Sequence, residues 1–233
     1  MRNLLHLFLT AALVLAPAAA LAWSDNFDGY ANGSGLHGQG GWRGWDGNVG
    51  ANAFVTNVQS RSAPHSASIL PTSDIVQQYV GVNTGQWVLT GYIYVPSGVT
   101  GPQFLILLNT YNELGPYNWS DDILFDLTAN QVRDFDFPAT PPLPLIRNQW
   151  VQVRVELNFA ADNQAIYYGG NLLTSKSWTE GASGGGVLNL AALDLYSNNG
   201  ATVYWDDLSV VVAGTTAVEP TTWGRVKATF QGR

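Results

Sequence analysis

The chain has 233 residues, of which 17 are acidic and 10 are basic, and its formal net charge is −7. It contains no cysteine, which excludes disulfides, thiol catalysis and thiolate metal sites. An acidic chain with so few basic residues is a poor candidate for binding nucleic acid, and it suits neutral partners such as glycans better than polyanions.

The first 22 residues have the three parts of a secretory signal peptide. Arg2 gives a basic start, Leu4–Leu15 is an apolar run, and Ala20-Leu21-Ala22 is a small-residue cleavage site. A transmembrane anchor would need about 20 apolar residues with a stop-transfer flank, which this segment lacks. We therefore expect a mature chain that starts at Trp23, is secreted or held at the cell surface, and has no transmembrane segment.

The segment that follows is dense in Gly, Asn and Asp. Its short apolar fragments predict an opening strand near Asn26-Phe27 and then a long loop that contains Trp42 and Trp45. Phe54–Val58 has the composition of a strand, and Arg61–Pro64 that of a turn.

The middle of the chain predicts buried strands. Ile75–Val80 is a short apolar run, and Trp87–Val95 is a longer one with apolar or aromatic residues on both faces. Phe104–Leu108 is continuously apolar. Because a strand covered on both faces needs no polar alternation, we expect the two later strands to be central in their sheets.

A loop rich in polar and aromatic residues, Asn109–Asp121, comes next. Ile123–Leu127 and Val132–Phe137 then form a predicted hairpin. The four prolines of Pro138–Pro144 predict a loop, because proline donates no backbone hydrogen bond to a sheet.

Trp150–Phe159 has the clearest strand pattern in the sequence. Apolar residues alternate with polar ones along it, which is typical of a sheet with one face in water. Ala165–Tyr168 and Asn171–Leu173 flank Gly169-Gly170 and predict a tight hairpin. Val187–Tyr196 is the next predicted strand.

The closing strand, Thr202–Val212, carries two adjacent carboxylates inside an apolar run. Strict alternation would place Asp206 on one face with Tyr204, Leu208, Val210 and Val212. An ionised Asp on an apolar face needs hydrogen bonds, a charged partner or a metal. Otherwise a bulge must shift the register and turn the side chain outward.

No segment has a helical period over ten or more residues, and about ten short strands are separated by turn residues. We therefore predict one all-β domain, a sandwich or a barrel, over residues 23–212. A linker is predicted at 213–220, followed by a short basic tail at 221–233. The tail is either a loose terminus or a segment for sorting or surface attachment.

Five short motifs occur along the domain. The opening segment NFDGYANGSGLHGQGGW fits the pattern F-D-x-Y-x-x-G-x-x-L-x-G-Q-x-G-W, and SAPHSASI is similar to an S-x-P-N-S step. NQWV is similar to a W-V-x-V strand, YYGG to a Tyr-Asp-Gly hairpin, and VYWDDLSV to a closing Y-x-D-D-x-S. Together these motifs resemble the concanavalin A-like lectin/glucanase superfamily, as found in secreted bacterial proteins and similar to laminin G-like and carbohydrate-binding modules. The resemblance spans residues 23–212 and implies a jelly-roll β-sandwich of two antiparallel sheets. It does not specify a function, because this architecture carries lectins, binding modules, glycosidases and lyases.

The resemblance also implies a structural Ca²⁺ site, because many jelly-roll binding modules hold Ca²⁺ between the chain entry and the closing strand. Asp25 and Asp28, with Asn26 between them, would meet Asp206 or Asp207 there, and these oxygens are ligands that Ca²⁺ prefers. The alternative is that backbone amides satisfy the carboxylates.

The sequence gives little support to catalysis. The family's glucanases carry E-x-D-x-x-E on one strand, whereas no two glutamates lie within six residues of each other in this chain. Asp122 and Asp126, with Asp121 beside them, are the nearest equivalent, and an acidic strand end with a solvated face explains them better than a catalytic dyad does. Arg154–Leu157 matches the R-x-E-L of alginate lyases without their partner motifs. His37 and His65 have no nucleophile motif beside them. We therefore expect no enzyme activity.

Two segments have the mixture of aromatic and polar residues that glycan sites use, since sugars stack on aromatic rings and bond to amides and carboxylates. One runs from Trp42 to Asn48 and the other from Asn109 to Asp121. Trp42 is expected in the core. The predicted ligand-binding residues are Trp45, Tyr111, Tyr117, Asn118 and Trp119.

The sequence therefore predicts a secreted, non-catalytic, lectin-like protein that binds a glycan. The alternative is a structural or adhesive surface protein without glycan specificity. A polysaccharide hydrolase or lyase is the third hypothesis.

Overall fold

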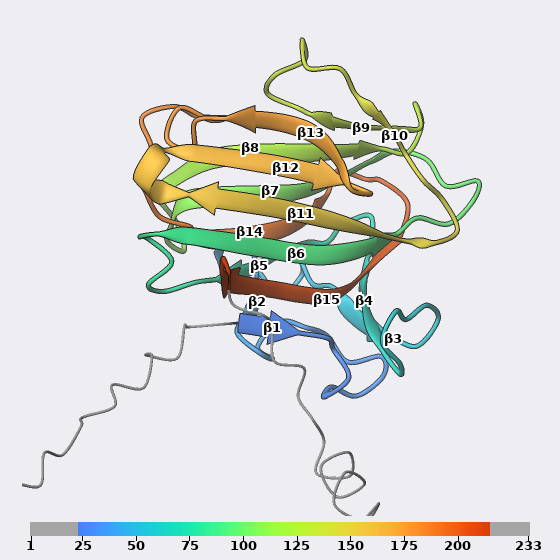
Figure 1. Ribbon diagram of the computed structural model, residues 1–233. Helices are drawn as coiled ribbons and strands as arrows, with labels where there is room; N and C mark the ends of the chain where they lie inside the picture. The colour runs from blue at the N-terminus through green and yellow to red at the C-terminus, as the bar shows by residue number, and fades with distance from the viewer. Residues whose placement is uncertain (1–22, 215–233) are drawn as a thin grey trace, which may run out of the picture.

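The computed structural model describes residues 23–214, which form two packed antiparallel β-sheets and their connections (Figure 1). The predicted signal peptide, the basic tail and most of the linker lie outside the described residues. Helical structure between residues 23 and 214 is limited to two 3-10 turns, η1 (Trp45–Gly47) and η2 (Phe159–Ala161). No helix of this part of the chain is long and apolar enough to span a membrane.

Sheet A has eight strands and lies in front in Figure 1. Its order is β13 (Asn171–Lys176), β12 (Asn163–Tyr168), β11 (Trp150–Asn158), β6 (Gln86–Tyr94), β15 (Val203–Val212), β4 (Ser66–Ile69) and β3 (Phe54–Thr56). The eighth strand, β1 (Trp23–Asp25), pairs with β15. The chain entry and the closing strand, between which the resemblance implies a Ca²⁺ site, therefore lie side by side.

Sheet B has seven strands and lies behind sheet A. Its order is β10 (Leu143–Pro144), β9 (Gln131–Asp134), β8 (Tyr117–Asp126), β7 (Pro102–Tyr111), β14 (Ala192–Ser197), β5 (Asp74–Gln78) and β2 (Trp42–Gly44). The structure confirms the predicted all-β sandwich of two antiparallel sheets.

The hydrophobic core lies between the two sheets. In β11, Val151, Val153 and Val155 are buried while the residues between them are half-buried, as the alternation predicts. Phe125 of β8 and Trp205 of β15 meet across the layers with ring centroids 5.7 Å apart. This burial of aromatic and branched side chains is the main source of stability for a chain without disulfides.

The central strand of sheet B carries apolar residues on both of its faces. In β7, Leu105 and Leu107 enter the core, whereas Ile106 and Leu108 belong to a second, smaller hydrophobic cluster. Ile106 and Leu108 are 8% and 0% exposed, so the outer face of this sheet is covered as well. The structure confirms that this strand is central and buried, and it also confirms that Trp42 is a core residue.

The closing strand β15 departs from strict alternation. Its register against β6 shifts between Asp206 and Ser209, and Asp207 has a positive φ of 47°. This β-bulge puts Trp205 and Leu208 in the core, three positions apart. Strict alternation is therefore broken, and the register-shifting bulge, which was the alternative, is present. Asp206 is nevertheless buried, so the prediction that the bulge turns this side chain outward was wrong.

The bulge lies where β15 changes its partner on one edge. Residues 203–205 pair with β4, and residues 208–210 pair with β1. Asp206 is fully buried between these two pairings, and its carboxylate accepts hydrogen bonds from the amides of Arg61 (2.7 Å), Ser62 (3.1 Å) and Asp207 (2.7 Å). Backbone amides thus satisfy the carboxylate, which was the alternative to a metal.

Other boundaries differ from the prediction where the sequence has few apolar residues. The opening strand is β1 rather than Asn26-Phe27, because Phe27 has a positive φ of 61° that a strand does not allow. β4 was not predicted, since its residues Ser66–Ile69 are small and polar except at the end. The predicted strand at Val187–Tyr196 is shorter and begins at Ala192.

We expect replacement of Asp206 by alanine to lower the free energy of unfolding by about 2–3 kcal/mol, because three backbone amides lose their shared acceptor at the bulge. Urea unfolding monitored by tryptophan fluorescence measures this loss. Asp206→Asn keeps one acceptor oxygen and should lose less. A loss below about 0.5 kcal/mol for Asp206→Ala would show that the bulge does not depend on this carboxylate.

Candidate functional site

Four aromatic side chains gather on the outer face of sheet B, and we call them the aromatic cluster. Tyr111 ends β7, Tyr117 and Trp119 lie at the start of β8, and Trp45 opens η1. The ring of Trp45 lies 5.0 Å from Tyr111, 4.9 Å from Tyr117 and 6.2 Å from Trp119 between centroids. The two indole rings are nearly parallel, with an angle of 11° between their planes.

Asp46 connects the two chain segments of the cluster. Its φ is +54°, and its Oδ1 accepts hydrogen bonds from the hydroxyl of Tyr117 and from the amide of Leu114 (2.8 Å). The amide of Asp46 donates to the hydroxyl of Tyr111 (3.1 Å). The residues around η1 and the β7–β8 hairpin, more than 60 positions apart in sequence, are thereby held together.

An irregular register between β7 and β8 directs the side chains of this hairpin. Leu107 pairs with Asp121 but Leu108 pairs with Trp119, so Ser120 is an extra residue. The bulge turns Trp119 to the outer face of sheet B and Asp121 to the inner face. The predicted loop Asn109–Asp121 was therefore wrong in its boundaries, because both ends belong to strands.

A buried amide network fills the bulge. The amide nitrogen of Asn109 donates to Asn118 Oδ1 (2.6 Å) and to the hydroxyl of Ser120 (2.8 Å). Asn118 in turn donates to the carbonyl of Gly184 (3.0 Å). The structure thus brings all five predicted ligand-binding residues together, with Asn118 committed to this network.

The aromatic residues differ in exposure. Tyr111 is only 8% exposed, whereas Trp45, Tyr117 and Trp119 are half-buried. Tyr111 therefore supports the cluster from below, and the three half-buried rings are the ones that solvent and a ligand reach.

Buried carboxyl groups lie on the outer face of sheet B next to the aromatic cluster. Asp194 of β14 lies in register between Val76 of β5 and Ile106 of β7, and Ile106 pairs with Asp122 of β8. Asp194 is 2% exposed and its Oδ1 has no hydrogen-bond partner. Asp74, two residues before Val76, is its neighbour on the same face.

Burial raises the pKa of Asp194 well above its usual range, and the charge and hydrogen bond of Asp74 raise it further. The pKa of Asp74 is raised to about 6, chiefly by burial, and the hydrogen bond from Asp194 opposes this rise. The two carboxyl groups interact, and burial favours a proton on Asp194 more strongly than on Asp74. Burial and then the charge of Asp136 raise the pKa of Asp122 to about 7.

Sequence reasoning missed Asp74 and Asp194. The signal was present, because Asp194 stands inside the apolar run LDL, as Asp206 stands in YWDDL. A carboxylate inside an apolar strand marks a site that needs a partner, and that argument applies to both.

The predicted calcium ligands at the chain entry are surrounded by hydrogen-bond donors. Asp25 accepts from the amide of Phe27 (2.9 Å), the hydroxyl of Tyr30 (2.7 Å) and the indole of Trp42 (2.9 Å). Asp28 accepts from the amide of His65 (3.0 Å).

The closing residues have donors as well. Asp206 is held by the three amides of the bulge, and Asp207 forms an ion pair with Arg61 and accepts from the hydroxyl of Ser62 (2.7 Å). Calcium at Asp25, Asp28, Asp206 and Asp207 stays a prediction, and the protein satisfies these four carboxylates with its own donors.

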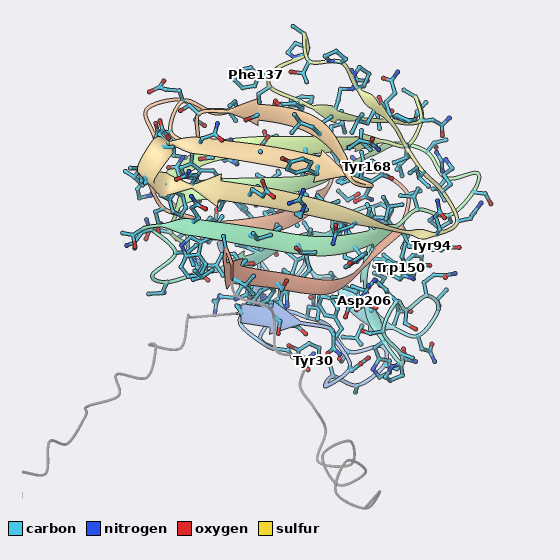
Figure 2. All side chains as sticks on the ribbon, in the orientation of Figure 1. Tyr30, Tyr94, Phe137, Trp150, Tyr168 and Asp206 are labelled. Carbon is cyan, nitrogen blue, oxygen red and sulfur yellow. The ribbon has the colours of Figure 1, made fainter. Side chains whose placement is uncertain are left out.

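A second aromatic group lies on the outer face of sheet A and was not predicted. Tyr94 lies 5.6 Å from Trp150 and 6.3 Å from Tyr204 between ring centroids, and Figure 2 shows Tyr94 and Trp150 side by side. On the same sheet, Arg154 forms an ion pair with Glu156 and lies over the ring of Tyr167. The arginine and the glutamate of the lyase-like R-x-E-L motif thus form an ion pair at the surface.

No family model and no curated protein matches the chain. Solved structures do: a sialidase has a TM-score of 0.56 at 9% identity over 83% of this chain and 18% of its own. Trypanosoma rangeli sialidase with the inhibitor DANA has a TM-score of 0.47 at 12% identity, over 69% and 27% of the two chains. The binding domain of botulinum neurotoxin serotype G has a TM-score of 0.41 at 11% identity, over 82% and 50%. The chain thus spans less than a fifth of the sialidase with the TM-score of 0.56, and this likeness shows that it has a β-sandwich fold of the kind found in that enzyme.

Proposed function

We propose that this chain is an exported, non-catalytic glycan-binding protein whose ligand lies on the outer face of sheet B. One observation carries the proposal: three half-buried aromatic rings, those of Trp45, Tyr117 and Trp119, meet beside the Asp46 carboxylate. Export rests on the signal-peptide pattern of residues 1–22.

Sugar recognition needs both parts of this arrangement. The apolar C–H face of a pyranose stacks on an aromatic ring, and its hydroxyls bond to carboxylates and amides. Asp46 uses Oδ1 for its two hydrogen bonds, and its Oδ2 accepts none from residues 23–214. That oxygen is therefore available to a hydroxyl donor.

The rigidity of the cluster favours binding. Tyr117 and Leu114 hold Asp46, and the Asn109 amide network fixes the bulge that presents Trp119. Because these groups are already ordered, a ligand does not have to order them on binding. The formal net charge of −7 favours a neutral glycan over an anionic one.

Removal of the Trp119 indole should weaken binding of a neutral oligosaccharide at least about tenfold, or roughly 1.4 kcal/mol, because a stacking surface is lost. A glycan array identifies the ligand, and isothermal titration calorimetry compares Trp119→Ala with the unmodified protein. Trp150→Ala is the matched control, since Trp150 is also half-buried but lies on sheet A.

If the unmodified protein binds no glycan on the array, the proposal is contradicted and the structural or adhesive alternative is favoured. Loss of binding in Trp150→Ala with retention in Trp119→Ala would place the ligand on sheet A instead.

The carboxyl pair Asp74–Asp194 favours polysaccharide hydrolysis as a second candidate function. General acid–base catalysis uses a carboxyl group of raised pKa together with a second carboxyl group, and the pKa values of Asp74 and Asp194 are both raised. This pair lies on the same face as the aromatic cluster, with Asp194 buried and Asp74 half-buried. A reducing-sugar assay on a panel of polysaccharides separates the two functions. The binding proposal expects no product, whereas product that disappears in Asp194→Asn would establish the hydrolase.

The raised pKa values also predict how stability depends on pH. In the unfolded chain these carboxyl groups ionise near their usual pKa of about 4, but in the folded protein Asp74 ionises near 6 and Asp122 near 7. The stability they contribute is full in acid and is lost as the pH rises toward 7, so the melting temperature should fall between pH 5 and pH 8.

Asp194→Asn should make this fall shallower, because an amide mimics the protonated carboxyl and never has to ionise. Thermal melts at several pH values measure the slope, with Asp126→Asn as a control on a partly exposed carboxylate paired with Arg133. An equally steep slope in Asp194→Asn would mean that Asp194 is not protonated in the folded protein.

A further inference from the structure

A buried ionic group joins the two sheets at the edge opposite to Asp206. Lys176 of β13 reaches across from sheet A, and its Nζ donates to Asp121 Oδ1 of β8 (3.0 Å) and to Asp134 Oδ2 of β9 (2.7 Å). The lysine side chain is 9% exposed and both aspartate side chains are fully buried. Phe137, whose ring lies 4.3 Å from Lys176 Nζ, marks this edge at the top of Figure 2.

The charges of this group do not balance. Asp136 adds a third carboxylate, and one oxygen from each of Asp121, Asp134 and Asp136 lies within 4.8 Å of the others. One lysine therefore faces three acidic groups, and a fourth, Asp122, is close enough to Asp136 for its pKa to be raised by that charge.

Each of the three carboxylates also keeps one buried oxygen without a partner. Within residues 23–214 no donor reaches Asp121 Oδ2, Asp134 Oδ1 or Asp136 Oδ2. Lys176 occupies the other oxygen of Asp121 and of Asp134. A buried carboxylate oxygen without a donor is unfavourable, and polar groups at such positions are normally satisfied by a donor, water or an ion.

A comparison with Asp206 shows that the carboxylates around Lys176 lack hydrogen-bond donors. Both Asp206 and Asp121 are fully buried, but three backbone amides surround Asp206 whereas Asp121 has only Lys176. Burial raises the pKa of Asp121 to about 8, with Lys176 opposing the shift, and burial also raises the pKa of Asp206 to about 7 despite its three amides. The site at Asp121 thus offers acceptors and lacks positive charge.

We propose that Asp121, Asp134 and Asp136 bind a calcium ion. The unpartnered ligands are all carboxylate oxygens, which favours a hard divalent cation over a transition metal. Opposed ligands of Ca²⁺ are roughly 4.6–5.2 Å apart, twice the Ca–O distance, and each of the three carboxyl groups has one oxygen within 4.8 Å of an oxygen of the other two. The three groups are therefore close enough to share one ion. Water completes the coordination.

This site differs from the entry site that the sequence predicted. It lies between β8, β9 and β13, away from the bulge of β15, as the positions of Phe137 and Asp206 in Figure 2 show. Calcium here would neutralise the excess charge and hold Asp121, two residues from Trp119, on the inner side of the β8 bulge. It would therefore stabilise the strand that presents the aromatic cluster.

Calcium chloride titrated into the metal-stripped mature protein at pH 7.5 tests the proposal by calorimetry and by thermal melting. We expect saturable binding of one ion per chain and a rise in the melting temperature. Asp136→Asn should weaken binding at least tenfold; this side chain is half-exposed and has no ion pair with Lys176, so its loss spares the buried pairs. Asp126→Asn, on the same hairpin but paired with Arg133, should bind as the unmodified protein does.

Absence of both heat and a melting shift at millimolar calcium would overturn the proposal and mean that Lys176 and bound protons alone balance the group. This outcome comes from the unmodified protein and depends on no variant. Binding that survives Asp136→Asn but is lost in Asp28→Asn would place the ion at the chain entry instead. Neither result bears on the glycan proposal, whose readout is oligosaccharide binding.

Discussion

The extra residue in β8, Ser120, decides what each face of sheet B carries. Trp119 and Asp121 are two positions apart and would share a face in a regular strand. Because Leu108 pairs with Trp119 and Leu107 with Asp121, the indole goes to the outer face and the carboxylate to the interior. The aromatic cluster and the buried ionic group therefore depend on the same bulge. Asn109 holds it by bonding to Ser120 and Asn118.

Several carboxyl groups are buried in this fold, and they differ in the hydrogen-bond donors that surround them. Asp206 accepts three backbone amides at the bulge of β15. Asp194 lies beside Asp74 on the outer face of sheet B, and burial raises the pKa of both. Asp121 and its neighbours rely on Lys176 and keep unpartnered oxygens. The last two keep carboxyl oxygens without a donor, and they carry the hydrolase and calcium hypotheses, whereas the glycan proposal rests on the aromatic cluster.

The regular part of the sandwich could be predicted from sequence because its side chains follow simple periods. The alternation of β11 and the Gly169-Gly170 hairpin gave the correct strands, and the continuous apolar run of β7 correctly indicated a central strand. In each of these strands the residue pattern follows directly from burial on one face or on both.

The irregular part could not be predicted, because a bulge leaves no period in the sequence. Strict alternation placed Asp206 on the same face as Leu208, whereas a bulge separates them. The polar residues around Tyr117 indicated a loop at the place where β8 begins. Likewise, β4 consists of small residues whose strand state comes from pairing with β15 and β3. The predicted ligand-binding residues nevertheless came together, since all five lie on two segments that Asp46 joins.

The most direct test of the account is the position of a bound oligosaccharide on the folded protein. NMR can follow the indole N–H signals of the tryptophans while a neutral oligosaccharide that the protein binds is titrated in. The signals that shift report which rings the sugar contacts. The account predicts shifts for Trp45 and Trp119 on the outer face of sheet B and none for Trp150 on sheet A. Shifts confined to Trp150 would contradict it.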